Sequence, residues 1–127
     1  MKFEHFALNV PDPVAMAAWY VEQCGMRVVR AMTASPFTHF LADATGRVIM
    51  EIYYNPQAAV PDYAERHPLI YHCAFAVEDP DAVKERLMAA GATHFETQAF
   101  PDGTRLIMMR DPWGIPLQLC KRGTPFQ

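Results

Sequence analysis

The sequence predicts an α+β fold of two βαβββ modules that form a curved mixed sheet or half-barrel cleft, with helices packed outside. A short apolar segment, a segment with helix-type periodicity and further short apolar segments occur in this order in each half of the chain. Matching residue pairs recur 67 positions apart, as positions 5 and 72 and positions 51 and 118 do. The length of 127 residues suits one domain, so residues 1–127 are expected to form a single duplicated domain.

The first module, residues 1–54, is expected to start with a strand over residues 3–10. Asp12 and Pro13 then supply an N-cap and a first-turn proline for a helix that ends at Gly25. A stripe with i, i+3, i+4, i+7 spacing predicts the helix face that packs on the sheet: Val14, Ala17, Ala18 and Val21. Apolar runs predict three more strands, at residues 27–32, 38–42 and 47–54.

Residues 55–68 carry three prolines and no periodicity, so they are interpreted as a linker. The second module, residues 69–121, repeats the order of the first. It is expected to contain a strand over residues 69–77, a helix after Asp79-Pro80, and strands at 93–98, 104–109 and 115–121. Residues 122–127 are expected to form a tail.

Charge and composition narrow the class of function. The chain has 11 Lys and Arg against 14 Asp and Glu, with no basic stripe, so nucleic acid is not expected as a partner. No apolar stretch approaches the ~18 residues of a membrane span, so no membrane partner is expected either. Three cysteines without C-x-x-C spacing are typical of reduced thiols and predict a cytoplasmic protein: Cys24, Cys73 and Cys120.

Strand alternation places one polar side chain among small or aromatic neighbours on one face of four strands. These side chains are His5, Glu51, His72 and Gln118. Ala7, Ala74 and Ala76 leave space beside them where a packed core would hold larger residues. A buried carboxylate such as Glu51 needs a cation, a partner or solvent. One divalent ion would satisfy all four side chains, and this mixed set suits Zn, Ni, Co, Mn or Fe without choosing among them.

A second interpretation stays open from the residues alone. Each histidine can be a hydrogen-bonded core residue, and Glu51 can pair with an arginine. Gln118 is the weakest candidate ligand, because an amide binds metals less well than a carboxylate and is no base near neutral pH. Cys120 shares the strand face of Gln118 and is a candidate pocket residue. Tyr53 and Asn9 share the surroundings of Glu51 and are candidates to orient a substrate.

With these residues, the chain resembles the vicinal oxygen chelate superfamily, which includes glyoxalase I, extradiol dioxygenases, fosfomycin-resistance enzymes and bleomycin-resistance proteins. It looks most similar to bacterial glyoxalase I, whose start aligns without gaps on residues 1–10. Residues 51–55, E-I-Y-Y-N, resemble its E-L-x-Y-N, and Asp111-Pro112-x-Gly114 precedes the last strand as in the family. The resemblance implies that His5, Glu51, His72 and Gln118 fall on four metal positions. It also implies a homodimer in which two chains complete each cleft.

Two departures separate the chain from glyoxalase I. There the fourth ligand is a glutamate that acts as base on the glutathione hemithioacetal, whereas this chain has Gln118. The arginine that binds the glutathione carboxylate in that enzyme is Asn9 here, although Asn55 matches a glutathione-contacting asparagine.

We therefore expect a metal-dependent isomerase or lyase that acts on a small molecule with vicinal oxygens and is not a true glutathione-dependent glyoxalase I. Glu51 is the candidate for proton transfer. The alternative is a metal-free protein that sequesters an apolar or aromatic ligand and resembles bleomycin-resistance proteins.

Overall fold

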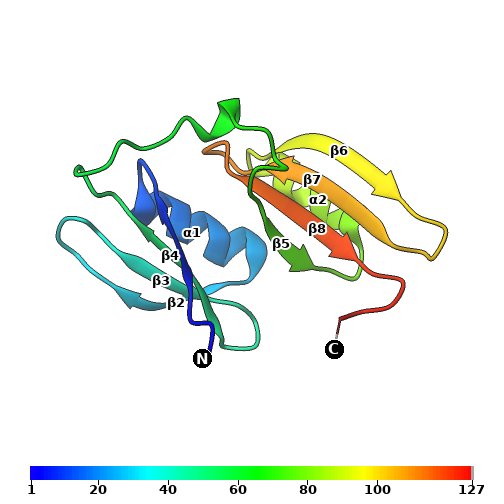
Figure 1. Cartoon of the computed structure of the whole chain (residues 1–127), viewed down its shortest axis with the longest axis horizontal. Helices are drawn as coiled ribbons and strands as arrows, with labels where there is room; N and C mark the ends of the chain where they lie inside the picture. Colours follow the sequence, from blue (N-terminus) through cyan, green and yellow to red (C-terminus); the bar gives the residue numbers. More distant parts are fainter. Residues whose placement is uncertain (127) are drawn as a thin grey trace. The chain divides into compact units, whose positions relative to one another are not determined.

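The chain forms two compact units, Met1–Pro61 (unit 1) and Asp62–Gln127 (unit 2), in a computed structural model that describes residues 1–126. Each unit holds one α-helix and a four-stranded mixed sheet (Figure 1), so the predicted α+β class with two βαβββ modules is confirmed. The boundary between the units falls inside the expected linker, residues 55–68. A half-barrel cleft shared by the modules stays a prediction.

Unit 1 follows the order strand, helix, three strands. Its elements are β1 (Phe6–Asn9), α1 (Pro13–Cys24), β2 (Arg27–Ala31), β3 (His39–Ala42) and β4 (Val48–Tyr53). The sheet order is β1-β4-β3-β2, with β1 and β4 parallel and the other neighbours antiparallel. The first and last strands of the module therefore lie side by side, which brings the residue before β1 close to the middle of β4.

Unit 2 repeats this arrangement after a short 3₁₀ helix, η1 (Tyr63–Glu65). Its further elements are β5 (Cys73–Ala76), α2 (Pro80–Ala89), β6 (Thr93–Ala99), β7 (Arg105–Arg110) and β8 (Pro116–Lys121). The sheet order is β5-β8-β7-β6. Ala7 pairs with Glu51 in unit 1 and Ala74 pairs with Gln118 in unit 2, so the register repeats at the same 67-residue offset.

The two helices start in the same way. Oδ1 of Asp12 accepts a hydrogen bond from the amide of Ala15 at 3.0 Å, and Oδ1 of Asp79 accepts one from Ala82, also at 3.0 Å. A proline occupies the first turn of each helix. Each cap satisfies a backbone N–H that has no partner within the helix and contributes about 1 kcal/mol.

The core of each unit lies between its helix and one face of its sheet. Helix α1 contacts β2, β3 and β4, and α2 contacts β6, β7 and β8. Leu41, Met50 and Ile52 are fully buried in unit 1, as are Ile107 and Leu117 in unit 2. The other sheet face carries the predicted site residues. We call it the open face, with Ala7, Phe40, Glu51 and Tyr53 in unit 1 and Ala74, Ala76, Gln118 and Cys120 in unit 2.

The predicted packing face of α1 is wrong. Val14 is 55% exposed and Val21 is 39% exposed. The helix instead buries Pro13, Met16, Ala17 and Tyr20. This set is also an i, i+3, i+4, i+7 stripe, shifted by one position. Because the helix is apolar on nearly all sides, periodicity alone does not distinguish the two stripes.

The strands that open the modules are shorter than predicted. Because the ladder to β4 starts at Phe6 and the ladder to β8 starts at Cys73, His5 and His72 each lie one residue before a strand. Both histidines are still held next to the first ladder pair of their sheet.

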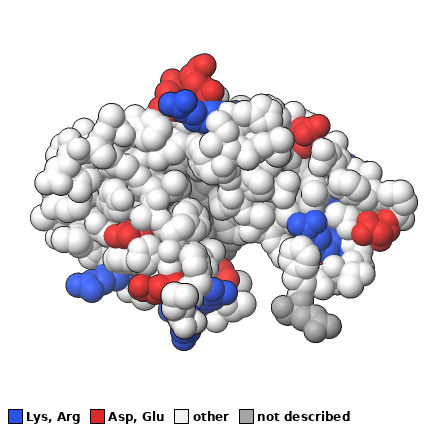
Figure 2. Space-filling model, viewed as in Figure 1, with Lys and Arg blue, Asp and Glu red and all other residues white. Residues whose placement is uncertain are grey.

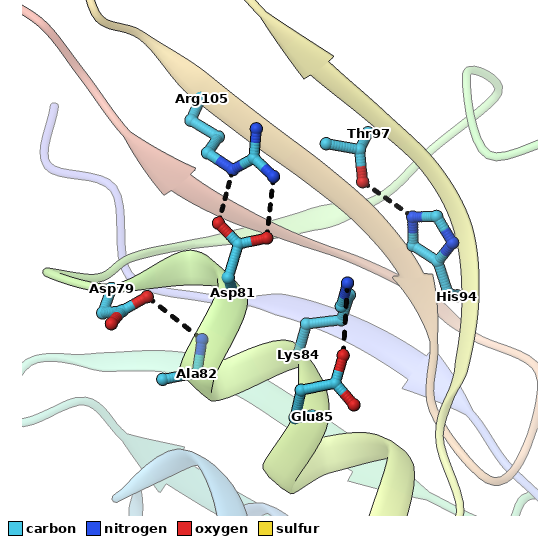
Figure 3. A network of polar contacts seen from close by, with 8 residues as sticks. All are labelled: Asp79, Asp81, Ala82, Lys84, Glu85, His94, Thr97 and Arg105. Atoms are coloured by element: carbon cyan, nitrogen blue, oxygen red, sulfur yellow. Dashed lines mark hydrogen bonds and ion pairs between the residues drawn. The ribbon is translucent and has the colours of Figure 1, made fainter.

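An ion pair ties α2 to β7 in unit 2 (Figure 3). The Nε and Nη2 atoms of Arg105 donate to the two carboxylate oxygens of Asp81 at 2.6 and 2.7 Å, a bidentate geometry. Nε2 of His94 lies 2.8 Å from Oγ1 of Thr97 on the neighbouring β6. The ion pair fixes the first turn of α2 on the sheet.

No helix in the described residues is long and apolar enough to cross a membrane. On the face drawn in Figure 2, acidic and basic side chains lie near one another in a few small groups, and neither sign covers a large patch. This distribution agrees with the modest net charge of −3.

Candidate functional site

His5 and Glu51 meet on the open face of unit 1. Strand β4 carries Glu51 between Met50 and Ile52, whose side chains point into the core. Nε2 of His5 lies 3.0 Å from Oε2 of Glu51, and the two side chains are 29% and 18% exposed. The contact is therefore partly shielded from water but still open to a ligand.

Besides Glu51, the His5 ring has an aromatic neighbour and a further carboxylate near it. Its ring packs edge-on against Phe40, with ring centroids 5.7 Å apart. Nδ1 is buried and has no hydrogen-bond partner among the described residues, although Oε2 of the exposed Glu4 lies 3.4 Å away. A carboxylate only accepts hydrogen bonds, so a direct bond to Glu51 requires that Nε2 carry the proton. Nε2 is thus the nitrogen of the His5 ring that would donate to Glu51.

His72 has a defined tautomer. Its Nδ1 lies 3.0 Å from the carbonyl oxygen of Pro68. Because a carbonyl only accepts, Nδ1 must be the donor, and the neutral ring then keeps its lone pair on Nε2. Metal-binding histidines commonly have this arrangement, in which a backbone carbonyl fixes the ring and leaves the other nitrogen available.

Gln118 lies on the open face of unit 2, opposite Ala74 in the ladder. Its Oε1 accepts a hydrogen bond from Sγ of Cys120 at 3.1 Å. Burial raises the pKa of the Cys120 thiol, so the thiol keeps the proton that it donates. An amide oxygen has a second lone pair, which stays available for another donor or a cation.

The side chain of Asn9 binds the backbone at the start of the linker. Its Nδ2 donates to the carbonyl oxygens of Asn55 and Ala58 at 3.0 and 2.8 Å, and its Oδ1 accepts from the amide of Asn55 at 2.8 Å. Oδ1 of Asn55 accepts from the amide of Gln57 at 3.0 Å. Tyr53 lies opposite Asn9 in the ladder, on the same face as Glu51. A role for Asn9, Tyr53 or Asn55 in substrate binding stays a prediction.

Unit 1 holds two of the four predicted ligands, His5 and Glu51, and unit 2 holds the other two, His72 and Gln118. Within either unit, the described residues contain no group of three His, Cys, Asp or Glu side chains that could hold a metal.

Two residues near these pairs were not identified from the sequence. Phe40 contacts His5, but its place opposite Glu51 follows only from the register of β3 and β4. Arg122 falls in the expected tail, residues 122–127, although it continues the two-residue steps from Gln118 through Cys120. That alternation was a signal that could have identified it.

Comparisons with known proteins agree with the fold. A family model described as the Glyoxalase/Bleomycin resistance protein/Dioxygenase superfamily matches residues 2–119. A glyoxalase family protein from Enterococcus faecalis is 25% identical, with a TM-score of 0.69 and a match that covers 94% of this chain and 97% of that one. Comparison with curated proteins gave no significant match.

Two further solved structures support the fold alone, because their identity is low. The antibiotic-binding protein TnmS3 from Streptomyces sp. CB03234 is 19% identical, with a TM-score of 0.68 and 96% of each chain covered. A glyoxalase-related enzyme from Fulvimarina pelagi is 21% identical, with a TM-score of 0.67 and a match that covers 94% of this chain and 87% of that one.

Proposed function

The chain belongs to the glyoxalase/bleomycin resistance protein/dioxygenase superfamily, and we propose that it is a metal-dependent isomerase or lyase acting on a small molecule with vicinal oxygens. His5, Glu51, His72 and Gln118 would hold one divalent ion, Zn, Ni, Co, Mn or Fe. The observation that carries the proposal is the 3.0 Å approach of His5 Nε2 to Glu51 Oε2 on the open face.

The donor atoms support this proposal. Two ligands that each lie about 2.0–2.2 Å from one ion stand roughly 3 Å apart when their bonds are near a right angle. The pair in unit 1 has this separation. In unit 2, Nδ1 of His72 donates to the Pro68 carbonyl, which leaves Nε2 as the nitrogen that can face a metal, and Gln118 offers an amide oxygen.

Each side chain would have a separate task. When bound, the metal would act as a Lewis acid toward two neighbouring substrate oxygens. Glu51 would move the proton, because it is the carboxylate of the set and the Gln118 amide is no base near neutral pH. Ala7 and Ala74 lie directly opposite Glu51 and Gln118 and would leave room for the substrate.

A true glutathione-dependent glyoxalase I is disfavoured by two residues. Gln118 replaces the catalytic glutamate of that enzyme, as noted from the sequence. Asn9 replaces its glutathione-binding arginine, and the Asn9 amide already bonds the backbone of Asn55 and Ala58. We expect a substrate other than the glutathione hemithioacetal.

The second candidate is a metal-free protein that sequesters an apolar or aromatic ligand. It is favoured by the contact of Cys120 with Gln118, in which the amide oxygen of a predicted ligand already accepts a hydrogen bond. TnmS3, which has the same fold, is described as an antibiotic-binding protein. This candidate would bind its ligand on the open faces without turnover.

Elemental analysis of the untagged protein, purified without chelator, tests the proposal. We expect about one divalent ion per chain, lost in His5→Ala and kept in the matched control His94→Ala, whose ring contacts Thr97 on β6. Failure of the parent protein to bind Zn, Ni, Co, Mn or Fe(II) after addition would favour the sequestering protein. We also propose a homodimer, which sedimentation of the same sample would test.

A further inference from the structure

A pocket of about 520 Å³ lies on unit 2 between β5, β8 and the C-terminal segment. Ala74, Ala76 and Val77 line one side, and Phe126 lines another. The volume falls in the range of about 300–1,000 Å³ that small-molecule sites occupy. Cys120 also lines it, so the pocket adjoins the open face on which Gln118 lies.

The charged lining of the pocket is mainly basic. The pocket is lined by two basic side chains, Lys121 and Arg122, and by one acidic side chain, Glu78. The guanidinium of Arg122 lies over the ring of Phe126, with Cζ 4.8 Å from the ring centroid. This cation–π contact places the Arg122 guanidinium beside Phe126, which also lines the pocket.

Arg122 is not neutralised by a direct partner in the described part of the chain, where its guanidinium makes no hydrogen bond or ion pair. Asp102 lies in a neighbouring groove that Arg122 also lines. The Asp102 carboxylate instead accepts from the amide and hydroxyl of Thr104 at 2.9 and 3.0 Å. Hydrogen bonds from Thr104 lower the pKa of Asp102 and the charge of Arg122 helps to lower it, but no carboxylate of the described residues pairs directly with the guanidinium. Its N–H groups at the edge of an apolar pocket are therefore suited to an anionic ligand.

We propose that this pocket binds a small carboxylic acid, with its apolar or aromatic body on Ala76 and Phe126 and its carboxylate on Arg122. The planar guanidinium matches a carboxylate with two parallel hydrogen bonds, and Lys121 adds positive charge. That this acid is the substrate rests on the proposed function. The pocket then selects the substrate by its charged end, while the vicinal oxygens react beside Gln118.

Hydrocinnamate and its neutral amide, hydrocinnamamide, test the pocket. Calorimetric titration of the full-length, metal-free protein at neutral pH should give at least about tenfold tighter binding of the acid than of the amide. Backbone amide signals of Ala74, Ala76 and Cys120 should shift during the titration of the acid. Equal affinity for the acid and the amide would overturn the proposal.

Charge variants locate the carboxylate contact. Arg122→Gln should remove the preference for the acid. Arg66 is an exposed arginine before β5, so the control variant Arg66→Gln should keep the preference. Glu78→Gln should tighten binding of the acid by about two- to threefold, because it removes an unfavourable charge. An Arg122→Gln variant that keeps the parent preference for the acid would refute the assignment. If the preference is lost, a backbone amide spectrum like that of the parent protein excludes misfolding as the cause.

The test separates this inference from the metal proposal. His5→Ala should lose metal but keep the preference for hydrocinnamate, because no pocket residue comes from unit 1. A protein that binds no metal but prefers the acid through Arg122 supports the pocket and refutes the enzyme. A protein that binds metal and does not prefer the acid refutes the pocket alone.

Discussion

Nε2 of His5 lies 3.0 Å from Oε2 of Glu51, although the two residues are far apart in the sequence. Parallel pairing of β1 with β4 brings them together, because it sets Ala7 opposite Glu51. The same pairing sets Ala74 opposite Gln118 in unit 2. Duplication of one module thus gives each unit a pair of ligand-type residues.

Gln118→Glu should increase metal affinity by about tenfold or more, because an added carboxylate raises the charge of the ligand set. Competition with a chelating dye would measure the change. Gln98→Glu adds the same charge on β6 and is the control. Equal effects of the two substitutions would show that Gln118 is not a ligand.

Asn9→Ala should lower the free energy of unfolding by about 1–3 kcal/mol, because it leaves backbone groups of Asn55 and Ala58 without their partner. Asn55→Ala removes one side-chain bond, to the amide of Gln57, and should cost less. Urea unfolding of both variants gives the comparison. A larger loss in Asn55→Ala would contradict the role assigned to Asn9.

Gly114→Ala should destabilise the protein more than Gly103→Ala. Both glycines have positive φ, +83° and +86°, so both substitutions introduce backbone strain of about 1–2 kcal/mol. A Cβ on Gly114 would also lie 2.8 Å from the amide nitrogen of Ala64, whereas one on Gly103 meets nothing within 4 Å. The clash should add about 1–3 kcal/mol in thermal or urea unfolding. Equal losses would argue against the close approach of Gly114 to Ala64.

Stability at acid pH should depend on the Asp81–Arg105 pair. The hydrogen bonds from Arg105 hold the pKa of Asp81 below its ordinary value of 3.8. Such a carboxyl stabilises the fold above the ordinary value, and the contribution is lost as the pH falls through the lower folded-state pKa.

Arg105→Gln should therefore be less stable than the parent at neutral pH, and the difference should shrink as the pH falls below 3.8. Carbon-detected NMR should show the Asp81 pKa return toward its ordinary value in Arg105→Gln, and less so in Lys84→Gln. A pH-independent difference in unfolding free energy would contradict the assignment.

The sequence predicted the duplication well because its signals are local and repeated. Asp12-Pro13 and Asp79-Pro80 mark helix starts by capping chemistry, which needs no tertiary contact. The packing face of α1 was mispredicted because both of its stripes are apolar. Packing against the sheet buries Met16 and leaves Val14 exposed, and the helix sequence alone does not show this.

The site was only partly predictable for a similar reason. Alternation predicted the strand face of Glu51 and Gln118 correctly, since period two is visible in a single strand; that the two residues are ligands stays a prediction. The contact of His5 with Phe40 depends on the pairing of three strands, which no single segment reveals. The contact of Arg122 with Phe126 depends on the path of the C-terminal segment after β8.

The central claim is that one divalent ion is bound by His5, Glu51, His72 and Gln118. Anomalous diffraction at the metal edge, from crystals of the protein grown with that metal, tests it most directly. We predict one anomalous peak per chain, about 2.0–2.3 Å from donor atoms of all four side chains. A peak on other residues, or crystals in which His5 bonds Glu51 directly and no peak occurs at saturating metal, would contradict it.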